Sequence, residues 1–387
     1  MNELTESAVA ILEKLVGFNT ISSESNLELI SYVAEYLEKL GVKSALVYDE
    51  SGLKANLIAT IGNPSVPGYV LSGHTDVVPV QGQHWQRDPF TLIREHDRVY
   101  GRGTSDMKGF LACVLAMVPR LQAKPLHRSV HIAFSYDEEV GCRGIHSLVD
   151  HLAANVATPI AAFIGEPTDM TVIEGHKGSR GMITKITGRA VHSSRPDIGL
   201  SALSAGMKIV QTLEQYAEEF KLGPKSAQPF SLPYATVSTG VLNSGTARNL
   251  IPGDCELQWE VRSIVPEEKD SVDRRLAAFV SDTLLPEMQA TFDGARVETT
   301  EVYDVPPLVA DEQSEAVRLA CKFAQTNHTR TIDYGTEAGF FQRRGISSVV
   351  CGPGRDSEAH ISDEWIGIEQ LEKCVNFLGA LVADARQ

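Results

Sequence analysis

The stretch YVLSGHTDVVP, residues 69–79, begins as an apolar run and then turns polar. A run such as Tyr69–Gly73 is typical of a buried strand, and His74 and Asp76 follow where that strand would stop. Three further apolar runs lead towards similar side chains: VHIAFSY (130–136) to Glu138 and Glu139, IAAFIG (160–165) to Glu166, and SSVVCGPG (347–354) to His360.

Together with Asp106, these side chains make five carboxylates and two imidazoles. In open α/β sheets, ligands bind beyond the carboxyl ends of the strands, so neighbouring strands would bring the whole set to one place. Like charges in a dry cleft cannot all remain ionised unless a cation compensates them. The sequence therefore predicts a metal centre at this edge of the sheet.

The length and composition are those of an ordinary globular protein with two domains. The chain has 387 residues, of which 43% are hydrophobic and 22% are charged, and one hydrophobic core rarely grows to this size. The formal net charge of −15 argues against nucleic acid and anionic membranes, because both reward clustered lysine and arginine. We therefore expect no nucleic-acid partner and no membrane partner.

The six cysteines form no CxxC pair, which is typical of reduced thiols in a cytosolic protein. The first residues, MNELTESAVAILEKLVGF, have the apolar spacing of a helix and lack the basic start of a signal peptide. The longest apolar run, FLACVLAMV, is far shorter than the roughly 20 residues of a membrane span. These features predict a cytoplasmic protein.

Local patterns predict alternating strands and helices. Ser25 and Glu28 have the spacing of a capping box, and the helical period of the following apolar residues continues to Gly41. The alternation indicates an α/β fold with a mostly parallel sheet flanked by helices. Strands are predicted near 55–61, 68–72, 129–136, 160–165 and 346–351, and helices near 107–121, 143–153, 312–326 and 367–385.

Residues 179–299 have a different pattern from the rest of the chain. Their predicted order is strand, helix, two strands, helix and strand, which is the order of a ferredoxin-like unit. This segment holds none of the clustered acids, yet His360 lies beyond it. We therefore expect an inserted domain at 179–299 that interrupts a metal-bearing domain of residues 1–178 and 300–387.

The number of candidate ligands favours two metal ions. A catalytic zinc ion takes about four ligands including a water, so two histidines and three or four carboxylates are too many for one ion. Two ions about 3.5–4 Å apart, bridged by a carboxylate and a water, would use the whole set. Of the adjacent Glu138 and Glu139, one could then bind metal while the other accepts a proton from the water. His74 could bind metal while Asp76 orients a ligand from behind.

Each of these features has a simpler explanation when it is taken alone. A lone His-x-Asp is more often a surface turn, adjacent glutamates often begin a solvated helix, and Glu166 before Pro167 can open a turn. His360 can be a structural histidine. These explanations weaken together, because all of them would have to coincide at strand ends of one domain. We interpret the histidines without such support as structural or surface residues: His84, His96, His127, His131, His146, His151 and His328.

Five ordered motifs resemble those of the co-catalytic zinc aminoacylase and carboxypeptidase family. The resemblance covers essentially the whole chain, including the insert. It implies a zinc-peptidase-like catalytic domain with two divalent metal ions, zinc in preference to cobalt, and an inserted lid domain through which two copies form a homodimer. The motifs are GHTDVVP (73–79), GRGTSDMKG (101–109), YDEEVG (136–141), GEPT (165–168) and GPGRDSEAH (352–360).

The matching positions imply a role for each residue of the cluster, and a cis peptide bond after Asp106. In the insert, His192 would stabilise the oxyanion in a partner subunit's site, and Asn249 and Arg262 would bind the substrate's carboxylate. A salt bridge within the insert is the alternative for Arg262. In the cluster, His74 and Glu166 would bind one metal ion, Glu139 and His360 the other, and Asp106 both, while Glu138 would be the general base and Asp76 would orient the ligand histidine.

The motifs HKG (176–178), EPTDM (166–170) and GTEAGFF (335–341) resemble one branch of the family. That branch removes the acetyl group from N2-acetyl-L-ornithine and supplies ornithine for arginine synthesis. Glu337 would meet the ammonium group of the substrate, or only brace its loop. The alternatives are a hydrolase of the same type that acts on another N-acyl amino acid, such as N-succinyl-diaminopimelate, or on a peptide, and a binding protein that has lost its chemistry. The intact Glu138 and the complete ligand set argue against the last.

Overall fold

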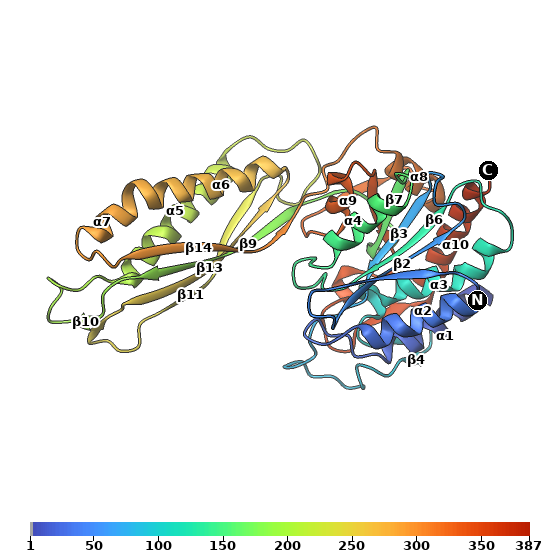
Figure 1. Ribbon diagram of the computed structural model, residues 1–387, viewed down its shortest axis with the longest axis horizontal. Helices are drawn as coiled ribbons and strands as arrows, with labels where there is room; N and C mark the ends of the chain where they lie inside the picture. Colours follow the sequence, from blue (N-terminus) through green and yellow to red (C-terminus); the bar gives the residue numbers. More distant parts are fainter. Residues whose placement is uncertain (1–2) are drawn as a thin grey trace. The chain divides into compact units, whose positions relative to one another are not determined.

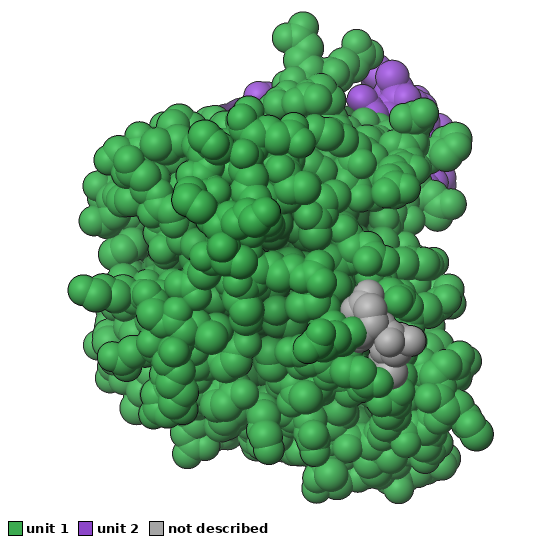
Figure 2. All heavy atoms as spheres, turned by 90° about the vertical axis from the view of Figure 1, so that its right-hand side faces the viewer, with its two compact units in different colours: residues 1–175, 310–331, 336–387 green, residues 176–309, 332–335 purple. Residues whose placement is uncertain are grey.

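The computed structural model describes residues 3–387 and divides them into two compact units. The first unit comprises the described residues up to 175 together with 310–331 and 336–387, and the second comprises 176–309 and 332–335. Figure 2 colours the two units separately. The insert expected at 179–299 falls within the second unit, which reaches further along the chain at both ends.

An eight-stranded sheet forms the centre of the first unit (Figure 1). Its central strands β6, β3, β7 and β16 are parallel, which confirms the predicted mostly parallel sheet at the place where the acids gather. Antiparallel pairs occur towards both edges, where β1 pairs with β2, β2 with β6, and β16 with β8. In spatial order the strands are β1 (Ser44–Tyr48), β2 (Ala55–Ile61), β6 (Val130–Ser135), β3 (Tyr69–His74), β7 (Ala161–Pro167), β16 (Ser348–Gly352), β8 (Val172–His176) and β15 (Thr329–Ile332).

The apolar core of the first unit lies between this sheet and a layer of helices. Helix α3 is apolar on all sides from Gly109 to Val118, and it packs against α1, α10 and the sheet. It approaches β7 so closely that a Cβ atom on Gly165 would lie 2.0 Å from Cγ of Phe110, so only glycine fits there. The helices of this core are α1 (Glu3–Val16), α2 (Leu27–Lys39), α3 (Gly109–Gln122), α8 (Glu315–Ala324) and α10 (Ile368–Ala385). Two others, α4 (Ile145–Asn155) and α9 (Ala338–Arg343), pack against each other outside it.

The start of α2 differs from the prediction. Asn26 is the N-terminal cap residue, and the capping box predicted from Ser25 and Glu28 is absent. The hydroxyl of Ser25 donates instead to the carbonyl of Leu53, 2.6 Å away, and thereby ties the helix start to a distant loop. The predicted end is correct, since Gly41 has a φ of 76°, which favours glycine.

The second unit has the predicted ferredoxin-like order. An antiparallel sheet of order β11-β13-β9-β14 carries helices α5 and α6, and alternate residues of β13 such as Leu257 and Trp259 enter the core between sheet and helices. A two-stranded ribbon pairs β10 (Val191–His192) with β12 (Leu250–Ile251). The main elements are β9 (Gly178–Thr187), α5 (Ala202–Leu222), β11 (Thr236–Ser244), β13 (Asp254–Ser263), α6 (Pro266–Phe279), α7 (Leu285–Gln289) and β14 (Arg296–Val305).

A small three-stranded sheet of order β17-β5-β4 also belongs to the first unit. It joins β4 (Ile93–Glu95) and β5 (Arg98–Tyr100) to β17 (Trp365–Gly367), so two segments far apart in sequence run side by side just before Asp106. No helix within residues 3–387 combines the length and the apolar character that a membrane span needs. All six cysteines are unpaired.

Candidate metal centre

The central strands bring the predicted side chains to one edge of the sheet. His74 is the last residue of β3, Glu166 lies near the end of β7, and Glu138 and Glu139 follow β6. Because β6, β3 and β7 are parallel neighbours, their carboxyl ends lie side by side. His360 follows β16, the next parallel strand, after one short helical turn.

Asp106 lies between the two imidazoles. Its Oδ1 atom is 3.0 Å from Nε2 of His74, and its Oδ2 atom is 3.1 Å from Nε2 of His360. Nε2 of His360 is also 3.1 Å from Oε1 of Glu139, and Nε2 of His74 is 3.8 Å from Oε1 of Glu166. The structure thus brings together all five residues predicted to bind metal, with Asp106 at the centre.

Burial makes this cluster costly unless positive charge accompanies it. Desolvation, and then the charge of Asp106, raises the pKa of Glu139 to about 7 and also raises the pKa of Glu166. Hydrogen bonds to Asp106 and Glu139 raise the pKa of His360 to about 11. Without a metal ion, protons therefore provide the compensating charge.

The donor set fits divalent metal ions. Ligand atoms of His74, Asp106 and Glu139 all lie within 4.8 Å of one another. Oε1 of Glu166 is buried and has no hydrogen-bond partner among the described residues, although buried carboxylate oxygens normally have one. Histidine nitrogen and carboxylate oxygen are the usual ligands of catalytic zinc.

Asp106 lies in a tight turn that begins after Gly103, whose φ is 83°. The peptide bond between Asp106 and Met107 is cis, as the resemblance implies. The backbone N–H groups of Ser105 and Asp106 both donate to the carboxylate of Glu364, at 2.9 and 3.1 Å. No local sequence pattern pointed to Glu364.

The carboxylate of Asp76 fixes the turn that carries the two glutamates. Oδ1 accepts the backbone N–H of Glu138 at 3.0 Å, and Oδ2 accepts that of Glu139 at 3.3 Å. The hydroxyl of Ser22, which sequence reasoning missed, donates to Oδ2 at 2.7 Å. His74 is held chiefly by the backbone of Asp76, because its Nδ1 atom is 2.9 Å from the carbonyl oxygen and 3.6 Å from the carboxylate.

Glu138 lies beside the candidate ligands, but unlike them its carboxylate forms no ion pair with another cluster residue in the described part of the chain. Its pKa is raised well above its usual value, first by desolvation and then by the negative charge of Glu166. The thiol of Cys142 lies 3.5 Å from Oε1 of Glu138. Glu138 is therefore a carboxylate that can exchange protons at the edge of the cluster.

Glu337 is fully buried at the start of α9. Neither of its carboxylate oxygens has a hydrogen-bond partner of normal geometry in the described part of the chain. Desolvation raises its pKa to about 7, and the nearby hydroxyl of Ser135 and charge of His74 offset only part of that shift. Glu337 is thus a second unsatisfied carboxylate of the first unit.

The remaining predicted residues lie in the second unit. His192 is exposed on β10, where its Nδ1 atom accepts the backbone N–H of Ser194 at 3.2 Å. Asn249 is also exposed, and its carbonyl accepts the backbone N–H of Ser193, so it neighbours His192 across the ribbon. Arg262, on β13, pairs with Glu260 through Nε and Oε1 at 3.0 Å, which is the salt bridge considered as its alternative.

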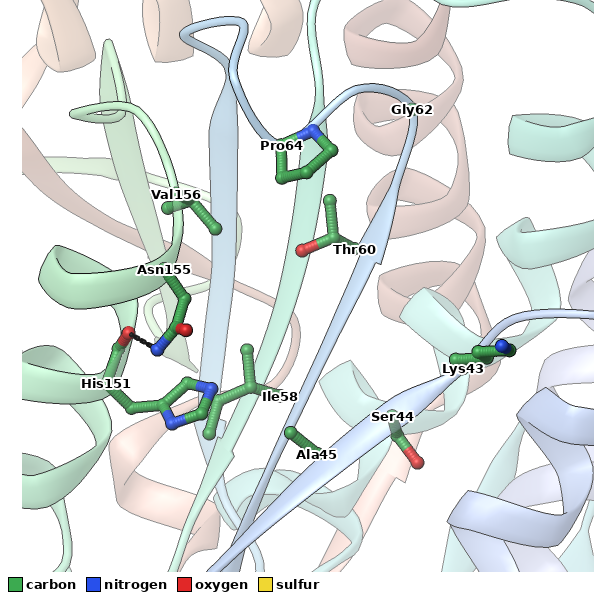
Figure 3. Close-up of a pocket in the computed structure, with 10 residues that line it drawn as sticks. All are labelled: Lys43, Ser44, Ala45, Ile58, Thr60, Gly62, Pro64, His151, Asn155 and Val156. Atoms are coloured by element: carbon green, nitrogen blue, oxygen red, sulfur yellow. Dashed lines mark hydrogen bonds between the residues drawn. The ribbon is translucent and has the colours of Figure 1, made fainter.

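A separate hollow lies over β1, β2 and α4 (Figure 3). Its wall includes Thr60, His151 and Asn155, and the amide of Asn155 donates to the carbonyl of His151 at 2.8 Å. The hydroxyl of Thr60 is already bonded to Nδ1 of His131. None of the residues of the acidic cluster lines this hollow.

Residues 70–384 match the peptidase family M20/M25/M40. The acetylornithine deacetylase of Aliivibrio salmonicida is 32% identical to the chain over 379 residues, which cover 96% of each protein. Among solved structures, an M20 family metallo-carboxypeptidase from Sulfolobus solfataricus has a TM-score of 0.76 at 21% identity and covers 99% of each chain. A dinuclear metal-binding peptidase of the M20 family from Bacillus subtilis has a TM-score of 0.66 at 17% identity, over 99% of this chain and 98% of that one.

The family match spans most of the sequence, and the acidic cluster lies in the part that it covers. The similarity to the relative from Aliivibrio salmonicida covers 96% of the chain, and therefore parts of both units. The chain therefore belongs to the peptidase family M20/M25/M40, and it is a hydrolase.

Proposed function

We propose that this hydrolase removes the acetyl group from N2-acetyl-L-ornithine and releases acetate and L-ornithine, a step towards arginine. The name of the Aliivibrio salmonicida relative, acetylornithine deacetylase, supports this substrate. The observation that carries the proposal is the position of Glu138, a protonatable carboxylate beside the candidate metal ligands that forms no ion pair with another cluster residue in the described part of the chain. When a metal-activated water hydrolyses an amide, a base next to the metal centre can take the proton of that water.

The candidate ligands divide into two sets around a shared carboxylate. His74 and Glu166 would hold one divalent ion, Glu139 and His360 would hold the other, and Asp106, whose two oxygens face the two imidazoles, would contact both. When bound, such ions polarise an amide carbonyl and lower the pKa of an attacking water. The donors suit zinc, and cobalt accepts the same ligands.

Glu138 would move the proton. It would accept a proton from the attacking water and return it to the amine nitrogen as the carbon–nitrogen bond breaks. Burial and Glu166 raise its pKa, which favours holding the proton between the two steps, while nearby cations would oppose the shift and keep the resting group ionised. Asp76 would keep Glu138 in place through the backbone N–H that it accepts.

The second unit would supply substrate contacts. Because Nδ1 of His192 accepts a hydrogen bond, the proton of the neutral ring belongs on Nε2, which could then donate to the developing oxyanion. Asn249 and Arg262 would bind the carboxylate of the substrate, for which the planar guanidinium is suited. Glu337 would pair with the side-chain ammonium of ornithine, since both of its oxygens lack partners among the described residues.

We also propose that the inserted domain is a lid through which two copies form a homodimer, with His192 acting in the partner's site. The six unpaired cysteines suit a reducing compartment and support a cytoplasmic location. Mixing a His192→Ala variant with a Glu138→Gln variant tests the exchange of residues. Activity that returns on mixing supports it, whereas two inactive variants that stay inactive as a mixed dimer contradict it.

The substrate is tested by initial rates on acetylornithine, succinyl-diaminopimelate, acetylmethionine and a dipeptide, with the metal content measured in the same samples. We expect the highest kcat/KM for acetylornithine and two bound divalent ions for each chain. A clear preference for another of these substrates would overturn the acetylornithine assignment. A purified protein without bound divalent metal and without activity would instead favour a binding function.

A further inference from the structure

Glu364 is a buried carboxylate that holds the turn carrying Asp106. Only 1% of its surface is exposed. Its Oε1 atom accepts the backbone N–H groups of Ser105 and Asp106, and its Oε2 atom accepts that of Gly103 at 3.0 Å. Nη1 of Arg102 donates to the same Oε2 atom at 2.7 Å. Four donors therefore converge on one carboxylate next to the central residue of the cluster.

Arg102 extends these contacts towards His360. Its side chain is also 1% exposed, and its Nη2 atom donates to Oε1 of Gln83 at 2.5 Å. The amide of Gln83 then donates to the backbone carbonyl of His360 at 2.7 Å. A continuous path of hydrogen bonds thus links the backbone of Asp106 to the backbone of His360 through Glu364, Arg102 and Gln83.

The segment around His360 needs such support because its backbone is unusual. His360 has a φ of 61° and Asp363 has a φ of 52°, both in the left-handed region that non-glycine residues rarely adopt. Such conformations persist only where surrounding contacts hold them. The carboxylate of Asp363 accepts the backbone N–H groups of Gln86 and Arg87, at 3.2 Å each, so the segment that contains Gln83 supports both residues.

We propose that Glu364, Arg102 and Gln83 are positioning residues that set the separation of Asp106 and His360, and thereby the affinity of the metal ion these two share. In the described part of the chain, none of the three side chains hydrogen-bonds to a ligand atom of the cluster, so they act through the backbone. The inference rests on the metal centre of the proposed function, but it does not depend on which acyl amino acid is the substrate.

Substitutions of Gln83 test the proposal with little disturbance of the fold, because the loss of this neutral side chain leaves no buried charge without a partner. In Gln83→Ala the link to His360 is lost, and in Gln83→Glu the acceptor for Arg102 is kept while the donor to His360 is lost. Gln86→Ala is the matched control, since the side chain of Gln86 makes no hydrogen bond in the described residues. Glu364→Gln is the stronger variant, because it leaves Arg102 without its charged partner.

The experiment measures metal binding by the intact protein after treatment with a chelator. Calorimetric titration measures the binding of Zn²⁺, and the visible spectrum reports the binding of Co²⁺. We expect both Gln83 variants to weaken one of two binding steps roughly 10- to 100-fold with little change in Tm, as is typical when a residue supporting a metal ligand is lost. Gln86→Ala should match the wild type, and Glu364→Gln should bind more weakly still.

Wild-type affinities in both Gln83 variants would overturn the proposal, and so would an equal loss in Gln86→Ala. A wild-type protein that binds two ions but does not hydrolyse acetylornithine would refute only the proposed substrate, because the effect of Gln83 on Zn²⁺ binding would still be measured. A wild-type protein that binds no divalent ion would overturn the inference together with the metal centre.

Discussion

The Sγ atom of Cys142 lies 3.5 Å from Oε1 of Glu138, and the thiol donates to this carboxylate. Cys142 is only 2% exposed, and desolvation together with the charge of Glu138 raises its pKa well above the usual value. The thiol therefore stays protonated at neutral pH and remains a donor, although a weak one. It stabilises the charged form of the proposed base.

Replacing this donor should shift the pH dependence of the reaction. Without the thiol the pKa of Glu138 rises. We therefore expect Cys142→Ala to shift the acid limb of the plot of kcat against pH to higher pH by about half a unit. This shift corresponds to a weak hydrogen bond of about 0.7 kcal/mol. Cys142→Ser should restore the limb, while Cys321→Ala serves as a control on α8. An unchanged acid limb in Cys142→Ala would show that the contact has no effect on the base.

The two adjacent glutamates should respond differently to neutralisation. Glu138→Gln should keep both metal ions and the fold but lower kcat about 100- to 10,000-fold, which is the usual contribution of a general base. Glu139→Gln should instead lose metal, because Oε1 of Glu139 lies 3.1 Å from Nε2 of His360 within the ligand group. Metal analysis and steady-state kinetics on both variants separate the roles. Full activity of Glu138→Gln would exclude it as the base.

The strand-end residues could be predicted because a single local rule locates them. Apolar runs end at His74, Glu138 and Glu166, and parallel strands place their ends at one edge of the sheet. The order of the second unit followed in the same way from alternating and helical periods. Apolar runs that end at polar residues, and the alternating and helical periods, are both patterns of residues that are neighbours in the chain. Such patterns can be recognised in a sequence.

The supporting contacts could not be predicted, because they join distant segments without a local pattern. Glu364 contacts the backbone of Ser105, which lies 259 residues earlier, and Ser22 contacts Asp76 across 54 residues. The capping box failed for a related reason. Its spacing was present, but the hydroxyl of Ser25 is bonded to the carbonyl of Leu53, 28 residues away.

Removing metal should destabilise the protein more at high pH than at low pH. Folding raises the pKa of Glu139 from 4.5 to about 7 and that of His360 from 6.5 to about 11. A group whose pKa is higher in the folded than in the unfolded protein stabilises the folded state at pH values below its unfolded pKa. This contribution is lost as the pH rises through the folded pKa. The metal-free protein should therefore lose stability as the pH rises from about 4.5 to about 11, most steeply between about 6.5 and 7, where both groups contribute.

Zn²⁺ should reverse this trend, because it replaces the protons and binds better as the ligands deprotonate. We expect saturating Zn²⁺ to raise the Tm of chelator-treated protein by roughly 5 °C or more at pH 8 and by less at pH 5.5. Thermal unfolding with and without Zn²⁺ at the two pH values measures the difference. A larger effect of Zn²⁺ at pH 5.5 would contradict the assignment of these groups as ligands.

Arg262 should affect substrate binding rather than metal binding. Its Nε and Nη2 atoms face Oε1 and Oε2 of Glu260 at 3.0 and 3.4 Å, and the hydroxyl of Tyr303 donates to the same glutamate at 3.0 Å. The guanidinium is thus held in one orientation and can exchange its partner for a substrate carboxylate. Lysine cannot reproduce that planar geometry, so we expect Arg262→Lys to raise KM about tenfold or more, at unchanged metal content. Arg296→Lys, in the same sheet, is the control, because within residues 3–387 the side chain of Arg296 donates only to the backbone carbonyls of Asp293 and Ala295. If Arg262→Lys kept the wild-type KM, the salt bridge with Glu260 would be the whole role of this arginine.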